Sequence, residues 1–310
     1  MKESTNLAKT LESIGDGNAA YDSNVKNLLA DKQILSRILK YTLDEFKDME
    51  LHEITKCICS DIVVESQFLD AGLSNLEKVQ GSATEDNVLN EGKILYDIRF
   101  SVRIKSTDII ILVNVEAQKS IDPKKLGYHI GNRIIFYLAR MISAEKETEF
   151  CKSDYDSIKK AVSIWICLSD EIEDGSIEKI EMQPSVLYGK DTGMLSVDLM
   201  EGYLISLRVK DDVKESKNEL ISMLEDLLNQ DSLAEKKSKL IEKHHLIMDV
   251  ELEGRLSSMC NLSERIEETT KEEIAIGMIR ENLSDEVIQR VTKLPLARIA
   301  ELREQEMCLA

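Results

Sequence analysis

The chain has little proline, few aromatic residues and a deficit of basic side chains. Its 310 residues include 3 Pro and 5% aromatics, a composition that fits a helix-rich protein. Lys and Arg number 40 against 58 Asp and Glu, which gives a net charge of −18. Because non-specific DNA affinity depends on neutralising phosphates with basic side chains, this charge excludes tight, non-specific coating of DNA.

Long apolar runs and cysteine motifs are also missing. No apolar run approaches the roughly 18 residues of a membrane span, and the first residues lack the apolar core of a signal peptide. We therefore expect no membrane partner. The 6 Cys show no repeated CxxC spacing, which indicates reduced thiols in a cytoplasmic protein. Cys57 and Cys59 have no second Cys or His pair nearby, so we expect packing residues, not zinc ligands.

Two β-branched, apolar runs are the most informative part of the chain. Ile94–Ile104 and Ile109–Gln118 flank the short polar segment Lys105–Asp108, which is the pattern of an antiparallel hairpin. A turn centred in that segment pairs residues whose numbers sum to 213, so Asp97 lies opposite Glu116. Side chains alternate between the faces of a strand. One face is then wholly apolar, from Tyr96, Ile98 and Phe100 to Val113 and Val115, and the other carries Asp97, Arg99, Arg103, Asn114, Glu116 and Gln118.

Two carboxylates that face each other raise each other's pKa, and a hard divalent cation removes this conflict by taking oxygen ligands from both. Asp97 and Glu116, followed by Gln118, are thus a candidate Mg²⁺ or Mn²⁺ site. The alternative is a solvated face on which these acids pair with Arg99 and Arg103.

The sequences Tyr96–Phe100 and Val113–Gln118 resemble the core of the PD-(D/E)XK nuclease superfamily. More narrowly, they are similar to the recombination-promoting nucleases or putative transposases, in which Gln commonly replaces the motif's lysine. Further segments agree in their order along the chain, from about Tyr21 to Lys210. They are Tyr21–Leu29, with Asp22 four residues before Lys26; Gly127–Tyr137, with Arg133 ahead of two aromatic residues; and Asp154–Cys167.

This resemblance implies a metal-dependent DNA endonuclease in which Asp97 and Glu116 hold the ion, Mg²⁺ or Mn²⁺. The ion would activate a water and stabilise charge on the scissile phosphate. Gln118 would bind that water, but as a neutral amide it supplies no positive charge. Asp22 is the candidate for an additional acid, and the expected phosphate-binding residues are Arg133, Tyr137 and Lys119.

The same residues also have structural interpretations. Gln118 is equally a polar strand end, and Asp22 an N-cap. Tyr137 is equally a packing residue beside a surface Arg133. Two functions therefore stay open: the endonuclease, and a catalytically weak or inactive nuclease-fold module that binds DNA or a protein partner. The local charge is compatible with limited DNA contact, because residues 91–140 hold nine basic and five acidic side chains.

The expected fold is mixed α/β, a small mixed sheet flanked by helices in a restriction-endonuclease-like core, with a C-terminal all-helical extension. We expect a tail at 1–20, the nuclease-like domain at 21–210 and helices at 211–310. Helices are predicted at Asn24–Tyr41 and Lys124–Ala144, and strands at Val162–Leu168 and Leu204–Val209.

The segment 284–304 has two interpretations. Ser284 is an N-cap candidate and Pro295 begins a second short helix, so the segment is similar to a helix-turn-helix. No Gly marks the turn and the second helix offers only Arg298 and Arg303 to DNA. We favour a packing or homo-oligomerisation role over base reading.

Overall fold

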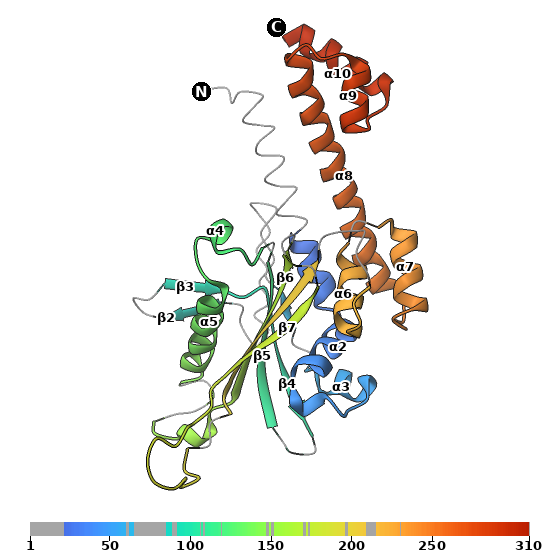
Figure 1. The fold of residues 1–310 in the computed structure, drawn as a ribbon. Coiled ribbons are helices and arrows are strands. Elements are labelled where there is room, and N and C mark those ends of the chain that lie inside the picture. The colour runs from blue at the N-terminus through green and yellow to red at the C-terminus, as the bar shows by residue number, and fades with distance from the viewer. Residues whose placement is uncertain are drawn as a thin grey trace. The chain divides into compact units, whose positions relative to one another are not determined.

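The computed structural model describes residues 22–309 except for 60–61, 65–84, 89–91, 209–214 and the positions 106, 108, 119, 147–148, 150–151, 170–171, 173, 196–197 and 230. The chain divides into two compact units, one formed by Asp22–Arg255 and one that contains Leu256–Ala310. The fold of the first unit is mixed α/β, as expected (Figure 1).

A six-stranded mixed sheet, in the order β1-β4-β5-β6-β8-β7, organises the described part of the first unit. The central pair is antiparallel, β4 (Ile98–Ile104) against β5 (Ile109–Gln118). β6 (Lys160–Ser169) runs parallel to β5 and to β8 (Met200–Arg208). The edges are β7 (Ser176–Glu181) and the two-residue β1 (Val63–Val64), while β2 (Glu85–Val88) and β3 (Gly92–Leu95) form a separate hairpin.

Helices cover the sheet on both sides (Figure 1), so most of each face of the central hairpin is buried, and the exposed positions lie near the turn. One face is the expected apolar one, on which Ile98, Phe100 and Val115 are at most 1% exposed. On the other face, α5 (Ile130–Ala144) packs Ile134, Leu138 and Met141 against Leu112 and Trp165, with further core members Tyr96, Ile130, Tyr137, Ala161 and Cys167. Asp97, Arg99, Asn114 and Glu116 on this face are therefore buried, whereas Arg103 is exposed and Gln118 is partly buried.

Two helices predicted as continuous are interrupted. The first is helical over 22–29 and begins again as α2 (Lys32–Thr42), because the Asp31 side chain accepts the Gln33 N–H and caps a new helix. The second divides into α4 (Pro123–Leu126) and α5, because Gly127 takes a left-handed conformation with φ 79°. In both cases a local capping interaction ends the helix despite continuing apolar periodicity.

The remaining helices of the first unit follow the apolar pattern more closely. They are η1 (Asp44–Phe46), α3 (Leu51–Cys57), η2 (Tyr155–Ser157), α6 (Glu219–Leu228) and α7 (Leu233–Glu242). The sequence analysis did not predict the edge strand β7. β7 alternates charges with only two Ile, a weak signal for a strand.

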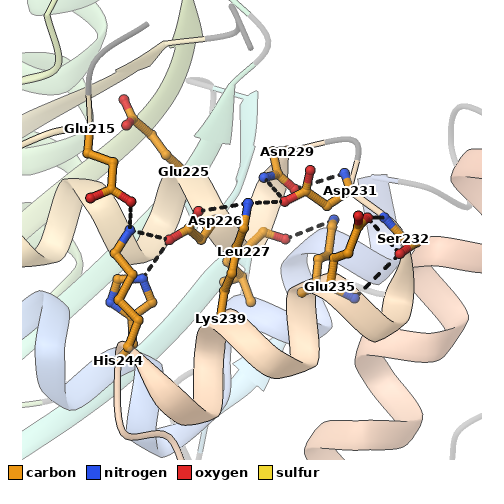
Figure 2. A network of polar contacts seen from close by, with 12 residues as sticks. Glu215, Glu225, Asp226, Leu227, Asn229, Asp231, Ser232, Glu235, Lys239 and His244 are labelled. Atoms are coloured by element: carbon orange, nitrogen blue, oxygen red, sulfur yellow. Dashed lines mark hydrogen bonds and ion pairs between the residues drawn. The ribbon is translucent and has the colours of Figure 1, made fainter. Parts of the chain in front are cut away.

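A polar network joins α6 to α7 (Figure 2). Both helices belong to the first unit, although the sequence analysis assigned them to the C-terminal helical region. Asp226 on α6 lies 2.8 Å from Lys243 Nζ and 2.7 Å from His244 Nε2. Burial raises the pKa of Asp226, but the bonds from Lys243 and His244 outweigh it, so the pKa lies below its usual value. His244, for which the sequence offered no partner, is thus a structural residue.

The second unit is helical. It contains most of α8 (Val250–Arg280), followed by α9 (Asp285–Thr292) and α10 (Leu296–Leu309). Ser284 stands at the N-cap of α9, and Lys293 ends that helix with φ 61°. Three helices share one core, made of Ala275, Ile279, Ile288, Leu294, Ile299 and Leu302. None of the described helices in either unit is long and apolar enough to cross a membrane.

Candidate active site

The two predicted acids meet at the end of the central hairpin. The pairs Ile98↔Val115 and Arg99↔Asn114 have the predicted register, with numbers that sum to 213. Asp97 lies immediately before β4, and its main-chain N–H donates to Glu116 Oε1 over 3.1 Å. In return, the N–H of Ala117 donates to Asp97 Oδ2 over 2.9 Å. These two bonds fix both carboxylates against the main chain opposite.

The expectation that Tyr96 lies on the opposite face is wrong. β3 ends at Leu95 and β4 begins at Ile98, so the chain bends between two sheets at Tyr96 and Asp97 and the strand alternation is lost there. The Tyr96 ring packs edge-on against Tyr137, with centroids 5.4 Å apart. Tyr96 therefore belongs to the layer beneath α5, on the side of the acids.

Both acids are buried, which removes the interpretation of a solvated face. Asp97 is 6% exposed and Glu116 is 1% exposed. Burial raises the pKa of Asp97, and the nearby Lys26 ammonium partly offsets this. Burial also raises the pKa of Glu116 well above its usual value, and the Asp97 charge adds to the rise, against weaker opposition from Arg133 and Asn114. Each carboxyl group thus keeps its proton to a higher pH than a solvated acid does.

Lys26 forms an ion pair with Asp97. It lies on the helical segment 22–29, is 5% exposed, and places Nζ 2.8 Å from Asp97 Oδ1 and 3.0 Å from Asp22 Oδ2. Burial alone would lower its pKa, but Asp97 and Asp22 more than compensate, so Lys26 stays charged. Asp22 is linked to Asp97 by their shared ion pair with Lys26, and its own side chain is 33% exposed.

Arg133 is held in place by aromatic side chains. Its guanidinium donates to the hydroxyl groups of Tyr128 and Tyr137. It also lies 5.1 Å from the ring of Trp165, a residue whose register partner on β5 is Glu116. A guanidinium stacked on rings and bonded at two nitrogens is fixed in orientation. Its positive charge partly offsets the rise in the pKa of Glu116.

The structure gives no contact with Asp97 or Glu116 for the other predicted site residues that it describes. Gln118 ends β5, two residues beyond Glu116, and is only partly buried. Lys119 lies outside the described residues. In the basic window 91–140, Arg99 and Arg140 are buried, whereas Arg103, Lys105, Lys124 and Lys125 are exposed.

Lys26 is the residue whose place in the site the sequence analysis did not assign. The signal was present in the Asp-x-x-x-Lys spacing of Asp22 and Lys26, which puts both on one helical face. What the spacing does not give is the contact of that face with Asp97, which depends on how the helix packs on the sheet.

The donor set fits a hard divalent cation. Asp97 and Glu116 offer carboxylate oxygens, the ligand type that Mg²⁺ prefers, and Mg²⁺ is commonly held by one or two carboxylates together with water and phosphate oxygens. Within the described residues no group of three or more His, Cys, Asp or Glu is arranged to hold a metal. Asp97 and Glu116 are the two carboxylates that would hold such an ion, and their oxygens already accept bonds from Lys26 and from the main-chain N–H groups of Asp97 and Ala117.

Comparisons with protein-family models, with curated proteins and with solved structures find no match to this chain.

Proposed function

We propose that the chain is a metal-dependent DNA endonuclease of the recombination-promoting nuclease type, which hydrolyses phosphodiester bonds. The observation that carries the proposal is the pair Asp97 and Glu116, two buried carboxylates with raised pKa values that are held together by reciprocal main-chain bonds. A purely structural site would be more stable with one buried acid than with two, because each buried charge destabilises the folded state by several kcal/mol unless it is compensated.

In this proposal Asp97 and Glu116 hold Mg²⁺ or Mn²⁺. When bound, the ion would supply Lewis-acid stabilisation of the phosphate and would lower the pKa of a water. Lys26 supplies, beside Asp97, the positive charge that the neutral Gln118 lacks. Arg133 binds a phosphate oxygen with the N–H groups that its tyrosine partners leave free.

The second candidate is a nuclease-fold module without strong catalysis. The observation that favours it is the ion pair of Lys26 with Asp97, at 2.8 Å with both side chains less than 10% exposed. Such a pair already neutralises one acid without a metal. The neutral Gln118 and the net charge of −18 point in the same direction.

Nicking of supercoiled plasmid with Mg²⁺ or Mn²⁺ tests the proposal. We expect cleavage by the purified chain, its loss with EDTA, and its loss in Asp97→Asn and in Glu116→Gln. The matched control is Glu145→Gln, since Glu145 is also 1% exposed and burial raises its pKa to about 7, but it bonds the main chain of Lys159. Equal cleavage by wild type, Asp97→Asn and Glu116→Gln would refute the site.

A further inference from the structure

The connection between β7 and β8 exposes apolar side chains to solvent. Leu187 and Tyr188 are 94% and 99% exposed. The loop turns back at a defined contact, in which Asp191 Oδ1 accepts the Gly193 N–H over 2.8 Å and Gly193 takes φ 65°. Four further residues of the loop are more than half exposed: Met182, Val186, Met194 and Leu195. Apolar side chains gathered in this way are typical of a surface that another molecule covers.

The two ends of this loop form a pocket of about 470 Å³. Three acids line it, Glu181 at the end of β7 and Asp191 and Asp198 in the loop. Its apolar lining includes Met182, Leu195 and Met200. In the part of the chain that the structure describes, no Lys or Arg lines the pocket. The pocket therefore fits a ligand that has both a positive charge and an apolar part.

Two lysines beside the pocket are already paired with acids. Lys160 Nζ lies 3.0 Å from Asp198 and 3.1 Å from Glu201. Lys179 Nζ lies 2.7 Å from Glu181 and 2.8 Å from Glu201. Lys160 also bonds Glu45 Oε1, whereas Glu45 Oε2 is buried and has no hydrogen-bond partner among the described residues.

The pocket and this ion-pair network together carry an excess of negative charge. The acids are Glu45, Glu181, Asp191, Asp198 and Glu201, and the paired cations are Lys160 and Lys179. With the exposed Lys190 of the loop also counted, the acids still exceed the cations by two. A further cation at this surface would therefore be attracted by an uncompensated negative potential.

The pocket is separate from the candidate active site. Met200, at the start of β8, is the register partner of Ala161 on β6. The register partner of Glu116 is Trp165, four residues further along β6. Four residues of a strand span about 13 Å. A ligand in the pocket therefore occupies a second surface, and the excess of acids there repels the phosphates of DNA.

We propose that residues 181–195, with Asp198 and Met200, form a docking surface for a protein segment that carries Lys or Arg among apolar residues. The cationic side chain enters the pocket and bonds its carboxylates, while its apolar stem packs on the methionines. The apolar neighbours of that side chain cover Leu187 and Tyr188. Charge complementarity selects this occupant, because a second copy of the chain brings a net charge of −18 and is repelled by an acidic surface.

Fluorescence anisotropy with the full chain tests the proposal. The probes are short labelled peptides with a central Lys or Arg between Leu, Val or Phe residues, and the control peptides carry Gln at the centre. We expect saturable binding of the Lys and Arg peptides, with about tenfold lower affinity in Asp191→Asn/Asp198→Asn and in Leu187→Ser/Tyr188→Ser. All four positions are exposed, so these variants should keep the wild-type Tm. The measurement needs no cleavage, so it is independent of the nuclease activity.

Matched control variants separate this surface from the general acidity of the chain. Asp174→Asn/Glu242→Gln removes two exposed acids elsewhere in the first unit. Ile247→Ser/Val250→Ser removes two apolar side chains that are 74% and 90% exposed. Both controls should bind the peptides as the wild type does.

Four results would overturn the proposal. They are no binding of any Lys or Arg peptide, equal binding of the Gln peptides, equal losses of affinity in the pocket variants and the controls, and self-association of the wild type that Leu187→Ser/Tyr188→Ser abolishes. The last result would show that the surface joins two copies of the chain.

Discussion

Replacing Lys26 by Met removes one charge from the site at nearly constant side-chain length. The Lys26 and Asp97 side chains are 7% and 9% exposed and lie 2.8 Å apart, so their pair belongs to the buried class. Breaking such a pair from one side costs about 3–5 kcal/mol, because a buried charge loses its partner. For a unit of this size each kcal/mol lowers Tm by about 2–4 °C. We therefore expect Lys26→Met to lower Tm by roughly 6–20 °C at neutral pH.

Thermal unfolding followed by circular dichroism at several pH values measures this loss. Burial raises the folded-state pKa of Asp97, and without Lys26 that pKa rises further. The native state then holds more protons than the unfolded state between the ordinary and the raised pKa, so stability falls as pH rises through this interval. The deficit of Lys26→Met should accordingly shrink in acid, where Asp97 is protonated. Mn²⁺ should raise the Tm of the variant, since a bound cation replaces the missing charge.

Two further variants test whether the Lys26–Asp97 pair compensates a buried charge. Lys47 and Asp44 form an exposed pair, with side chains 61% and 71% exposed, and Lys47→Met should cost at most about 1 kcal/mol. In Lys26→Met/Asp97→Asn the orphaned charge is gone, so most of the lost stability should return. If Lys26→Met costs no more than Lys47→Met, or if the double variant loses the sum of the single losses, the pair does not compensate a buried charge.

Three other predictions follow from the same contacts. Glu116→Gln should abolish nicking and raise Tm at neutral pH, with a flatter pH dependence, because the raised pKa of Glu116 makes its ionisation unfavourable in the folded state; unchanged cleavage would refute its role. Gln118→Lys should keep activity and require more metal, since an ammonium repels the ion; a variant that binds metal and DNA but cleaves nothing would contradict this. Arg303→Ala should lower the stability of the second unit without weakening DNA binding in a gel-shift assay, because Arg303 bonds Asp285 and the Leu283 carbonyl; a selective loss of DNA affinity would favour base reading.

The central hairpin was predictable because its alternation of apolar and polar residues admits one register. A shift by one residue would exchange the two faces and place the charged side chains at the positions that the apolar core requires. The pairing of Asp97 with Glu116 follows from that register. The breaks at Asp31 and Gly127 were not predicted, because helical periodicity continues across both and only the capping geometry reveals them.

The burial of the acids could not be derived from the sequence. A polar strand face is compatible with solvent or with a covering helix, and the choice depends on where α5 packs. The same holds for Trp165, whose register with Glu116 comes from the parallel pairing of β5 and β6. Parallel neighbours are joined through a helix, so their register is not fixed by a turn. The contacts between elements that are distant in the sequence, such as α5 on the sheet and β6 beside β5, were therefore known only from the structure.

The balance of charge in the site is one physical argument for the proposal that Asp97 and Glu116 bind a cation and do not only form a structural ion pair. Asp22, Asp97 and Glu116 carry three negative charges, and the cations that act on them are Lys26 and Arg133. A structural pair is most stable when its charges cancel, because any excess charge stays in a poorly solvated place. Here the acids exceed the cations by one when all are ionised. Burial is the main cause of the raised pKa values of Asp97 and Glu116, and repulsion between the acids adds to it. In the proposed function, a bound divalent cation would reverse the sign of this imbalance, and the positive charge left over would be neutralised by a phosphate of the substrate.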